Sequence, residues 1–189
     1  MENLPEELLY RILVRCDVKT RLKAEQVCSK WCRCMPYDIR YLDILECLFH
    51  DSNRKKMDTL PIDNFLGALL TRCGPYLEAI SFGQNYLLIT NSALRLLLRA
   101  NCERLVEIDL SFCTLTENSV PVLLNFAEQL LSLNLGNTSF SISDVAAFTG
   151  YMVTLFNSFT KLTRLNLQNA NQHLLAAVKH LPRHKHRRD

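Results

Sequence analysis

The chain has 189 residues, of which 48% are hydrophobic and 22% charged, and its formal net charge is +3. This composition excludes a disordered chain, and no apolar run approaches the roughly 18 residues of a membrane span. The N-terminus is acidic, with Glu2, Glu6 and Glu7, which is unlike a secretory or mitochondrial targeting segment. The sequence therefore predicts a globular protein of the cytoplasm, with the nucleus as a second location.

The first predicted element is a short helix in the stretch LPEELLYRIL, residues 4–13. Pro5 suits the first position of a helix, and the two glutamates after it suit the positive end of the helix dipole. Four apolar residues recur at helical spacing and form one stripe: Leu8, Leu9, Ile12 and Leu13. The segment behind this helix is too small to bury the stripe alone.

Two more short helices are predicted before residue 36. One begins after Asp17, a suitable cap, and the next carries Val27, Cys28 and Trp31. A unit of roughly 40 residues usually needs a metal, disulfides or a partner to be stable. An open patch of Leu, Ile, Val and Trp has the composition of an interface core, so a partner protein is the simplest answer.

The cysteines do not favour a metal site. Cys28, Cys32 and Cys34 lie close together and His50 follows, but the second ligand pair of a zinc site is absent from the sequence. Disulfides are rare inside cells. We therefore expect buried thiols that act as small apolar side chains, with no metal and no cofactor.

The second half contains an internal repeat. Four segments have the form L-x-x-L-x-L, and they cover residues 77–82, 105–110, 130–135 and 162–167. Their starts lie 28, 25 and 32 residues apart. A period of about 20–29 residues is typical of leucine-rich repeats, each of which holds a strand and a helix.

An apolar residue followed by a hydroxyl residue recurs between these segments. Thr90, Thr116 and Ser143 are therefore predicted helix caps, and the helices are expected at about 91–101, 117–129 and 144–157. A shorter helix is expected from Leu174 to His180. The predicted core residues of the three longer helices are Leu94, Leu97, Leu98, Val120, Leu123, Leu124, Ala127, Val145, Phe148, Met152 and Phe156.

Units of this kind cannot bury their apolar side alone, but stacked units share one continuous core. Strand alternation turns Ile108 and Leu110 inward and Glu107 and Asp109 outward. The outward residues of such a sheet form a broad curved surface without a deep pocket, which favours recognition of another molecule.

Three cysteines fall in register with the repeat, and the best single copy is CERLVEIDLSFCTLTENSV, residues 102–120. The pattern around Cys73, Cys102 and Cys113 resembles the cysteine-containing class of leucine-rich repeats. The resemblance implies that Cys113 satisfies backbone groups in the turn after its strand.

The N-terminal residues resemble an F-box. The matching features are Leu4-Pro5, Leu8, Ile12-Leu13, Asp17-Val18, Leu22 and Val27-Cys28-x-x-Trp31. Cys16 and Arg21 depart from the family pattern, where leucine is common, and Glu25 stands where serine is common. The stretch RYLDIL, residues 40–45, resembles the strand that follows an F-box and caps the first repeat.

These resemblances imply an α/β fold: a three-helix F-box followed by a short leucine-rich-repeat solenoid, with a curved parallel sheet inside and helices outside. The implied divisions are an F-box at 1–38, a linker with a capping strand at 39–61, about four repeats at 62–181 and a disordered basic tail at 182–189. No proper cap follows Leu167, although terminal repeats normally need one.

The F-box resemblance implies a non-catalytic substrate receptor of an SCF-type cullin–RING ubiquitin ligase. The F-box would dock on the S-phase-kinase-associated adaptor protein, which holds the cullin, and the repeats would bind an unknown protein substrate. The implied adaptor-binding residues are Leu4, Pro5, Leu8, Ile12, Leu13, Val27, Cys28 and Trp31. The implied substrate-binding residues are Ser81, Glu107, Asp109, Ser132, Asn134, Arg164 and Asn166.

Simpler interpretations remain open at this point. Leu8, Ile12 and Trp31 could equally hold the three helices together, and the strand residues could form an ordinary solvated face. The chain could also be a repeat scaffold outside the ubiquitin system. An enzyme is disfavoured because no phosphate loop, nucleophile elbow or metal pair is found, and none of the five histidines has a convincing acidic or nucleophilic neighbour.

The basic residues gather at the C-terminal end. Residues 179–189 carry five basic side chains and one acidic one, so +4 of the net charge resides there and −1 in the rest. This tail is most simply a solvated end, with nuclear localisation or phosphate contact as the alternative. A nearly neutral body with a basic tail is only weak evidence for nucleic-acid binding, so nucleic acid is not an expected partner.

Overall fold

The computed structural model describes residues 4–48, 62–83 and 91–179, and combines helices with a parallel sheet. The helices are α1 (Glu6–Leu13), α2 (Val18–Glu25), α3 (Ser29–Arg33), α4 (Ile44–Leu48), α5 (Ile62–Cys73), α6 (Asn91–Arg99), α7 (Ser119–Leu124), α8 (Val145–Ser158) and α9 (Gln172–Val178). The strands are β1 (Tyr41–Asp43), β2 (Ala79–Ser81), β3 (Glu107–Asp109), β4 (Thr114–Thr116), β5 (Ser132–Asn134), β6 (Ser139–Ser141) and β7 (Arg164–Asn166).

The main sheet has five parallel strands in the order β1-β2-β3-β5-β7, so each strand lies beside the next copy along the chain. Each L-x-x-L-x-L segment supplies one strand, which begins two residues after the first leucine of the segment. The central residues Leu42, Ile80, Ile108 and Leu133 align in register and are buried. The expected strand in residues 40–45 is confirmed as β1, the first strand of this sheet.

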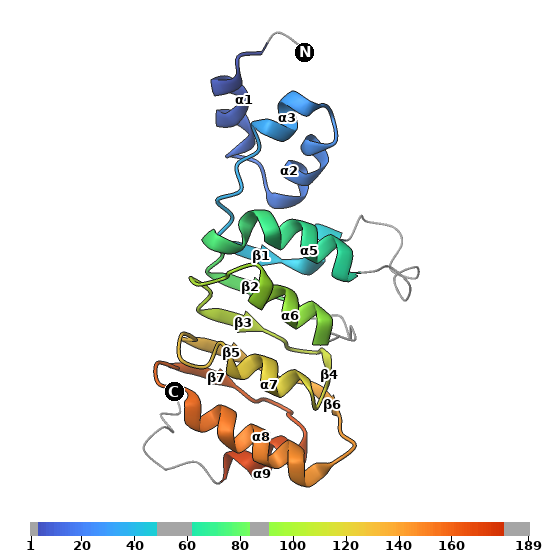
Figure 1. The fold of residues 1–189 in the computed structure, drawn as a ribbon, viewed down its shortest axis with the longest axis vertical. Helices are drawn as coiled ribbons and strands as arrows, with labels where there is room; N and C mark the ends of the chain where they lie inside the picture. The colour runs from blue at the N-terminus through green and yellow to red at the C-terminus, as the bar shows by residue number, and fades with distance from the viewer. Residues whose placement is uncertain (1–3, 49–61, 84–90, 180–189) are drawn as a thin grey trace.

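The helices α5 to α9 cover one side of the sheet, and each contacts the next in chain order (Figure 1). Short helices α1 to α3 lie at one end of this elongated stack (Figure 1). A single large core runs between the strands and the helices, from Ile39 to Ala177. Within the described ranges, no helix combines the length and apolarity needed to cross a bilayer.

The predicted cap residues are wrong where the structure describes them. Thr116 ends strand β4, and helix α7 begins three residues later. Ser143 is also outside its helix: Asp144 caps α8, accepting from the backbone N–H of Ala146 and Ala147. Thr90 lies outside the described residues.

The reason is a second parallel ladder, which the sequence reading missed. Strand β4 pairs with β6, with Leu115 opposite Phe140. Both strands read polar–apolar–polar, which is the alternation of a short strand with one buried face. The hydroxyl residue after Leu115 therefore points to a strand and not to a helix start.

Helix α7 is shorter than the expected 117–129, because the backbone passes into successive turns after Leu124. Most predicted core residues are buried, including Leu94, Leu97, Val120 and Phe148. Leu98 and Val145 are wrong and are exposed. Leu98 is rotated about 100° from Leu97 around the helix, and Val145 is the first residue of α8, ahead of the buried stripe.

Candidate functional site

The three N-terminal helices have a small core of their own. Its buried residues are Leu9, Leu13, Ala24, Cys34 and Met35, with Leu4, Trp31 and Tyr37 packed against them. Lys30 Nζ donates to the carbonyl oxygen of Leu4 at 2.6 Å and holds α3 against the start of α1. This end of the molecule is thus a distinct unit with few buried side chains.

Helix α1 divides the predicted apolar stripe between the core and the solvent. Leu9 and Leu13 are buried, whereas Leu8 is 46% exposed and Ile12 is 50% exposed. Successive residues turn by about 100° around a helix, so Leu8 and Ile12 form a row on one flank of the buried pair. The side chains of Tyr10 and Val14 are exposed on the other flank. One apolar row of α1 therefore remains available to a partner.

The other predicted adaptor residues occupy three kinds of position. Val27 is 61% exposed, and Pro5 and Cys28 are exposed as well. Leu4 and Trp31 are half-buried against the small core. Leu13 is buried in the small core.

Helix α2 begins as predicted. The Asp17 carboxylate accepts the backbone N–H of Thr20 at 2.6 Å, and this bond lowers the pKa of Asp17. An ionised cap at the positive end of a helix stabilises its first turn.

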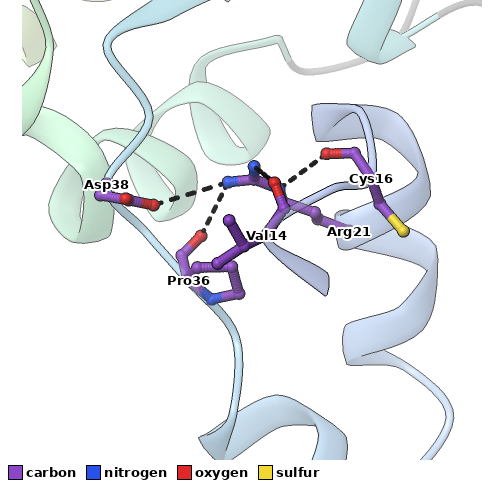
Figure 2. A network of polar contacts seen from close by, with 5 residues as sticks. All are labelled: Val14, Cys16, Arg21, Pro36 and Asp38. Atoms are coloured by element: carbon purple, nitrogen blue, oxygen red, sulfur yellow. Dashed lines mark hydrogen bonds and ion pairs between the residues drawn. The ribbon is translucent and has the colours of Figure 1, made fainter. Parts of the chain in front are cut away.

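Arg21 joins three separate segments of the unit (Figure 2). Its guanidinium donates to the carbonyl oxygens of Val14 at 2.6 Å and Cys16 at 2.9 Å, which follow the end of α1. It also donates to the carbonyl of Pro36 at 3.3 Å and pairs with Asp38 at 3.7 Å. Arg21, one of the positions at which the sequence departs from the F-box pattern, therefore ties α1, α2 and the outgoing chain together.

The outer side of the main sheet carries two rows of aligned side chains. We call them the first row (Tyr41, Ala79, Glu107, Ser132 and Arg164) and the second row (Asp43, Ser81, Asp109, Asn134 and Asn166). The predicted substrate residues all belong to these rows, so the structure does bring them together on one surface.

The second row has a structural role that the sequence reading missed. In each case a side-chain oxygen accepts the backbone N–H two residues further on, at 2.8 to 3.3 Å. After β2, β3, β5 and β7 these bonds close the turn that follows the strand, whereas Asp43 after β1 accepts the N–H groups of Leu45 and Glu46 in the first turn of α4. A Cβ added to Gly136 would lie 3.1 Å from the side chains of Asn134 and Asn166, so the turn also needs that glycine. A short polar residue at the end of every strand was the available signal.

Two predicted substrate residues are buried, which corrects their expected exposure. Ser81 and Ser132 are each 8% exposed. Ser132 lies in register between Glu107 and Arg164, whose side chains pair at 2.8 Å across it. The most exposed side chains of the first row are therefore those of Glu107, Arg164 and Tyr41.

Tyr41 was not among the predicted site residues, although strand alternation in residues 40–45 places it beside Ala79. It is 55% exposed. Partial burial raises the pKa of Tyr41, the nearby Asp43 carboxylate adds to the rise, and a hydrogen bond with the Ser81 side chain opposes it. The phenol is therefore neutral at physiological pH and offers a ring and a hydroxyl at one end of the row.

The repeat cysteines behave as expected. Cys73, Cys102 and Cys113 are buried, and the Cys113 thiol donates to the carbonyl oxygen of Phe82 at 3.4 Å. Burial raises the pKa of Cys113 to about 12, so it stays a neutral thiol.

The N-terminal cysteines differ from the expectation of buried thiols. Cys34 is buried, but Cys32 is half-buried and Cys28 is exposed, because it caps the short helix α3. All eight cysteines are free. The residues that the structure describes contain no cluster of three or more potential metal ligands.

Comparison with known proteins identifies the N-terminal unit. Residues 1–39 match the family model described as F-box-like. No curated protein matches the chain. The matched residues end where the chain leaves the three short helices and enters β1. The chain therefore carries an F-box-like domain, joined to a parallel sheet with helices on one side.

Proposed function

We propose that this protein is the substrate-recognition subunit of an SCF-type cullin–RING ubiquitin ligase. F-box domains generally bind the S-phase-kinase-associated adaptor protein, and the F-box-like match over residues 1–39 is the observation that carries the proposal. The sheet and its helices would act as leucine-rich repeats that hold the substrate. The receptor itself would do no chemistry, because ubiquitin transfer needs from it only proximity and orientation.

The exposure of α1 supports the docking step. Leu8 and Ile12 form an exposed apolar row on α1, whereas Leu9 and Leu13 of the same helix are already buried in the small core. Burial of apolar side chains of this size in an interface makes the free energy of binding more favourable, because it removes apolar surface from water. The adaptor would cover Leu8 and Ile12, with Pro5, Val27 and Cys28 as further contacts.

The outer side of the main sheet, which we call the strand face, supports the substrate step. Its first row presents a phenol, a carboxylate and a guanidinium on a broad surface, which suits another protein better than a small molecule. The side chains of the second row are engaged in hydrogen bonds with the backbone just after each strand. We therefore assign substrate contact chiefly to Tyr41, Glu107 and Arg164. The proposed locations are the cytoplasm and the nucleus.

Binding of the purified adaptor to the full chain tests the docking step. Leu8→Asp with Ile12→Asp should weaken adaptor binding at least about tenfold, since two central apolar contacts become charged. The matched control is Val145→Asp with Leu175→Asp, which makes the same change at two exposed apolar residues on α8 and α9.

Circular dichroism should be unchanged in both variants. If the wild-type chain does not bind the adaptor, or if the α1 variant binds it normally, the ligase assignment is wrong. The chain would then be better described as an interaction scaffold outside the ubiquitin system.

A further inference from the structure

Three residues join the F-box-like domain to helix α5 of the sheet unit, which is the part of the chain from β1 to α9. Arg72 lies in the last turn of α5, and its guanidinium pairs with the carboxylate of Glu25, the last residue of α2. The same guanidinium donates to the hydroxyl of Tyr37 at 3.0 Å and lies 5.3 Å from the centroid of its ring. We call Glu25, Tyr37 and Arg72 the clasp.

The burial of Glu25 distinguishes the clasp from an ordinary surface ion pair. The side chain of Glu25 is only 14% exposed, compared with 42% for Glu78 in the Arg40 pair. A poorly hydrated carboxylate depends on its cation, because removal of the cation leaves the charge uncompensated. The Cys32 thiol also lies 3.8 Å from the same carboxylate oxygen. The Glu25 carboxylate therefore meets both its own domain and the sheet unit.

Apolar contacts reinforce the clasp on the same helix. Val18 and Leu22 of α2 pack against the large core of the sheet unit, whereas Ala24 belongs to the small core. Helix α2 thus contacts both cores. Arg21, on this helix, also holds the chain at Pro36 and Asp38, just before the sheet unit begins.

We propose that the clasp makes the F-box-like domain and the sheet unit one cooperative body, and that Glu25 and Arg72 are positioning residues that fix the direction of α1 relative to the strand face. Glu25 is one of the positions at which the sequence departs from the F-box pattern, where serine is common. The coupling between the F-box-like domain and the sheet unit does not depend on the proposed function. Its consequence for ubiquitin transfer rests on the proposed function.

Urea unfolding of the full chain, followed by two signals, tests the coupling. Trp31 is the single tryptophan and packs against the small core, so its fluorescence reports the F-box-like domain. Far-ultraviolet circular dichroism reports mainly the sheet unit. The two transitions should coincide in the wild type, as they do for one cooperative body.

Arg72→Gln should separate the two transitions, with the fluorescence midpoint lower by about 1 M urea and the dichroism midpoint nearly unchanged. Arg164→Gln is the matched control, because it removes the same charge from an ion pair inside the sheet unit. It should leave the two transitions coincident. In a Glu25→Gln background, the further change Arg72→Gln should have a much smaller effect.

Coincident transitions in Arg72→Gln, or separate transitions in the wild type, would overturn the proposal. If Arg72→Gln does not fold, Arg72→Lys carries the test with the same two outcomes, since lysine keeps the charge but loses the guanidinium that lies over the Tyr37 ring and donates to its hydroxyl.

Adaptor binding separates a positioning role of the clasp from a direct part in docking. Arg72→Gln should keep the adaptor affinity within about twofold of wild type, because Leu8 and Ile12 lie outside the clasp. A parallel loss of adaptor affinity would overturn the positioning role. If the wild-type chain does not bind the adaptor, the proposed function fails, but the unfolding test still decides the coupling.

Discussion

Arg164 and Glu107 pair across an intervening strand, with 2.8 Å between the Nη2 and Oε2 atoms, and so cover Ser132. Both side chains are well exposed. Exposed ion pairs contribute little, because water and salt screen them. Arg164→Gln should lower the free energy of unfolding by less than about 1 kcal/mol, measured by urea unfolding at low and high salt. A loss that is larger, or that persists in high salt, would contradict this.

Arg21→Leu should destabilise the F-box-like domain, although leucine is the family's common residue there. Leucine would leave the carbonyls of Val14, Cys16 and Pro36 without the donors that Arg21 provides. Loss of charged hydrogen bonds of this kind costs about 2–3 kcal/mol. Trp31 fluorescence during urea unfolding measures the change.

Arg15→Leu is the control for Arg21→Leu, because Arg15 is an exposed arginine between Val14 and Cys16, whose carbonyl oxygens Arg21 contacts. It should change stability by less than about 0.5 kcal/mol. Equal effects of the two substitutions would refute the role of the Arg21 network.

Phe112→Asn should stabilise the sheet unit. Phe112 has φ 59°, and the equivalent residues in the next two turns, Asn137 and Asn169, have φ 55° and 53°. The left-handed region costs an ordinary residue about 1–2 kcal/mol, while asparagine adopts it readily. We expect a gain of about 0.5–1 kcal/mol in thermal or urea unfolding. The reverse change, Asn137→Phe, should destabilise. A loss of stability in Phe112→Asn would mean that packing of the ring outweighs the backbone strain.

Thiol labelling should separate the cysteines by burial. Cys28 is exposed, whereas Cys73, Cys102 and Cys113 are buried, and burial raises the pKa of Cys73 and Cys113 to about 12. A thiol reacts as its thiolate and only when reagent can reach it. Iodoacetamide at pH 8 should modify Cys28 rapidly and the three buried thiols only in denaturant, as read by peptide mass spectrometry. Fast labelling of Cys113 in the folded chain would argue against its turn role.

Glu117 should contribute to stability in a pH-dependent way. Its carboxylate accepts from the hydroxyl and backbone N–H of Ser143 and from the N–H of Asp144, and these bonds lower its pKa below the usual 4.5. A carboxyl whose pKa is lower in the folded state stabilises the protein above its unfolded pKa. That contribution disappears as the pH falls through the folded pKa.

Glu117→Gln should therefore lower the melting temperature at pH 7 and have a much smaller effect near pH 3. A scanning calorimetry series over that range measures the difference. Asp17 carries a lowered pKa of the same origin on α2, so the variant should keep part of the acid sensitivity of the wild type. An effect of Glu117→Gln that is equal at both pH values would contradict the assignment.

The strands of the main sheet could be predicted from the sequence because each has the same local signal. Leucine or another apolar residue recurs at the same spacing within each segment and marks the buried positions. Ile108 and Leu133 are buried, as that spacing predicts. The second ladder was missed because β4 and β6 lie outside the L-x-x-L-x-L segments, and their polar–apolar–polar pattern also fits a helix start. Without the repeated leucines, the local pattern does not decide between a strand and a helix start.

The exposed apolar row of α1, where we propose that the adaptor docks, could be predicted only in part. The spacing of Leu8, Leu9, Ile12 and Leu13 showed a helix with one apolar stripe, but not which half faces inward. That choice depends on where α2 and α3 pack, as do the contacts of Arg21 and Glu25. The roles of the strand-face residues depended on hydrogen bonds within the turns, which residue type alone does not reveal for Asp109 or Asn134.

The division of the strand face into two rows has a practical consequence for engineering. Residues 43, 81, 109, 134 and 166 accept backbone hydrogen bonds just after their strands, so randomising them would remove those bonds and destabilise the sheet unit. A library that varies residues 41, 79, 107, 132 and 164 instead would alter the chemistry of the surface while the turns stay closed. New binding specificities are therefore accessible on alternate positions of each strand.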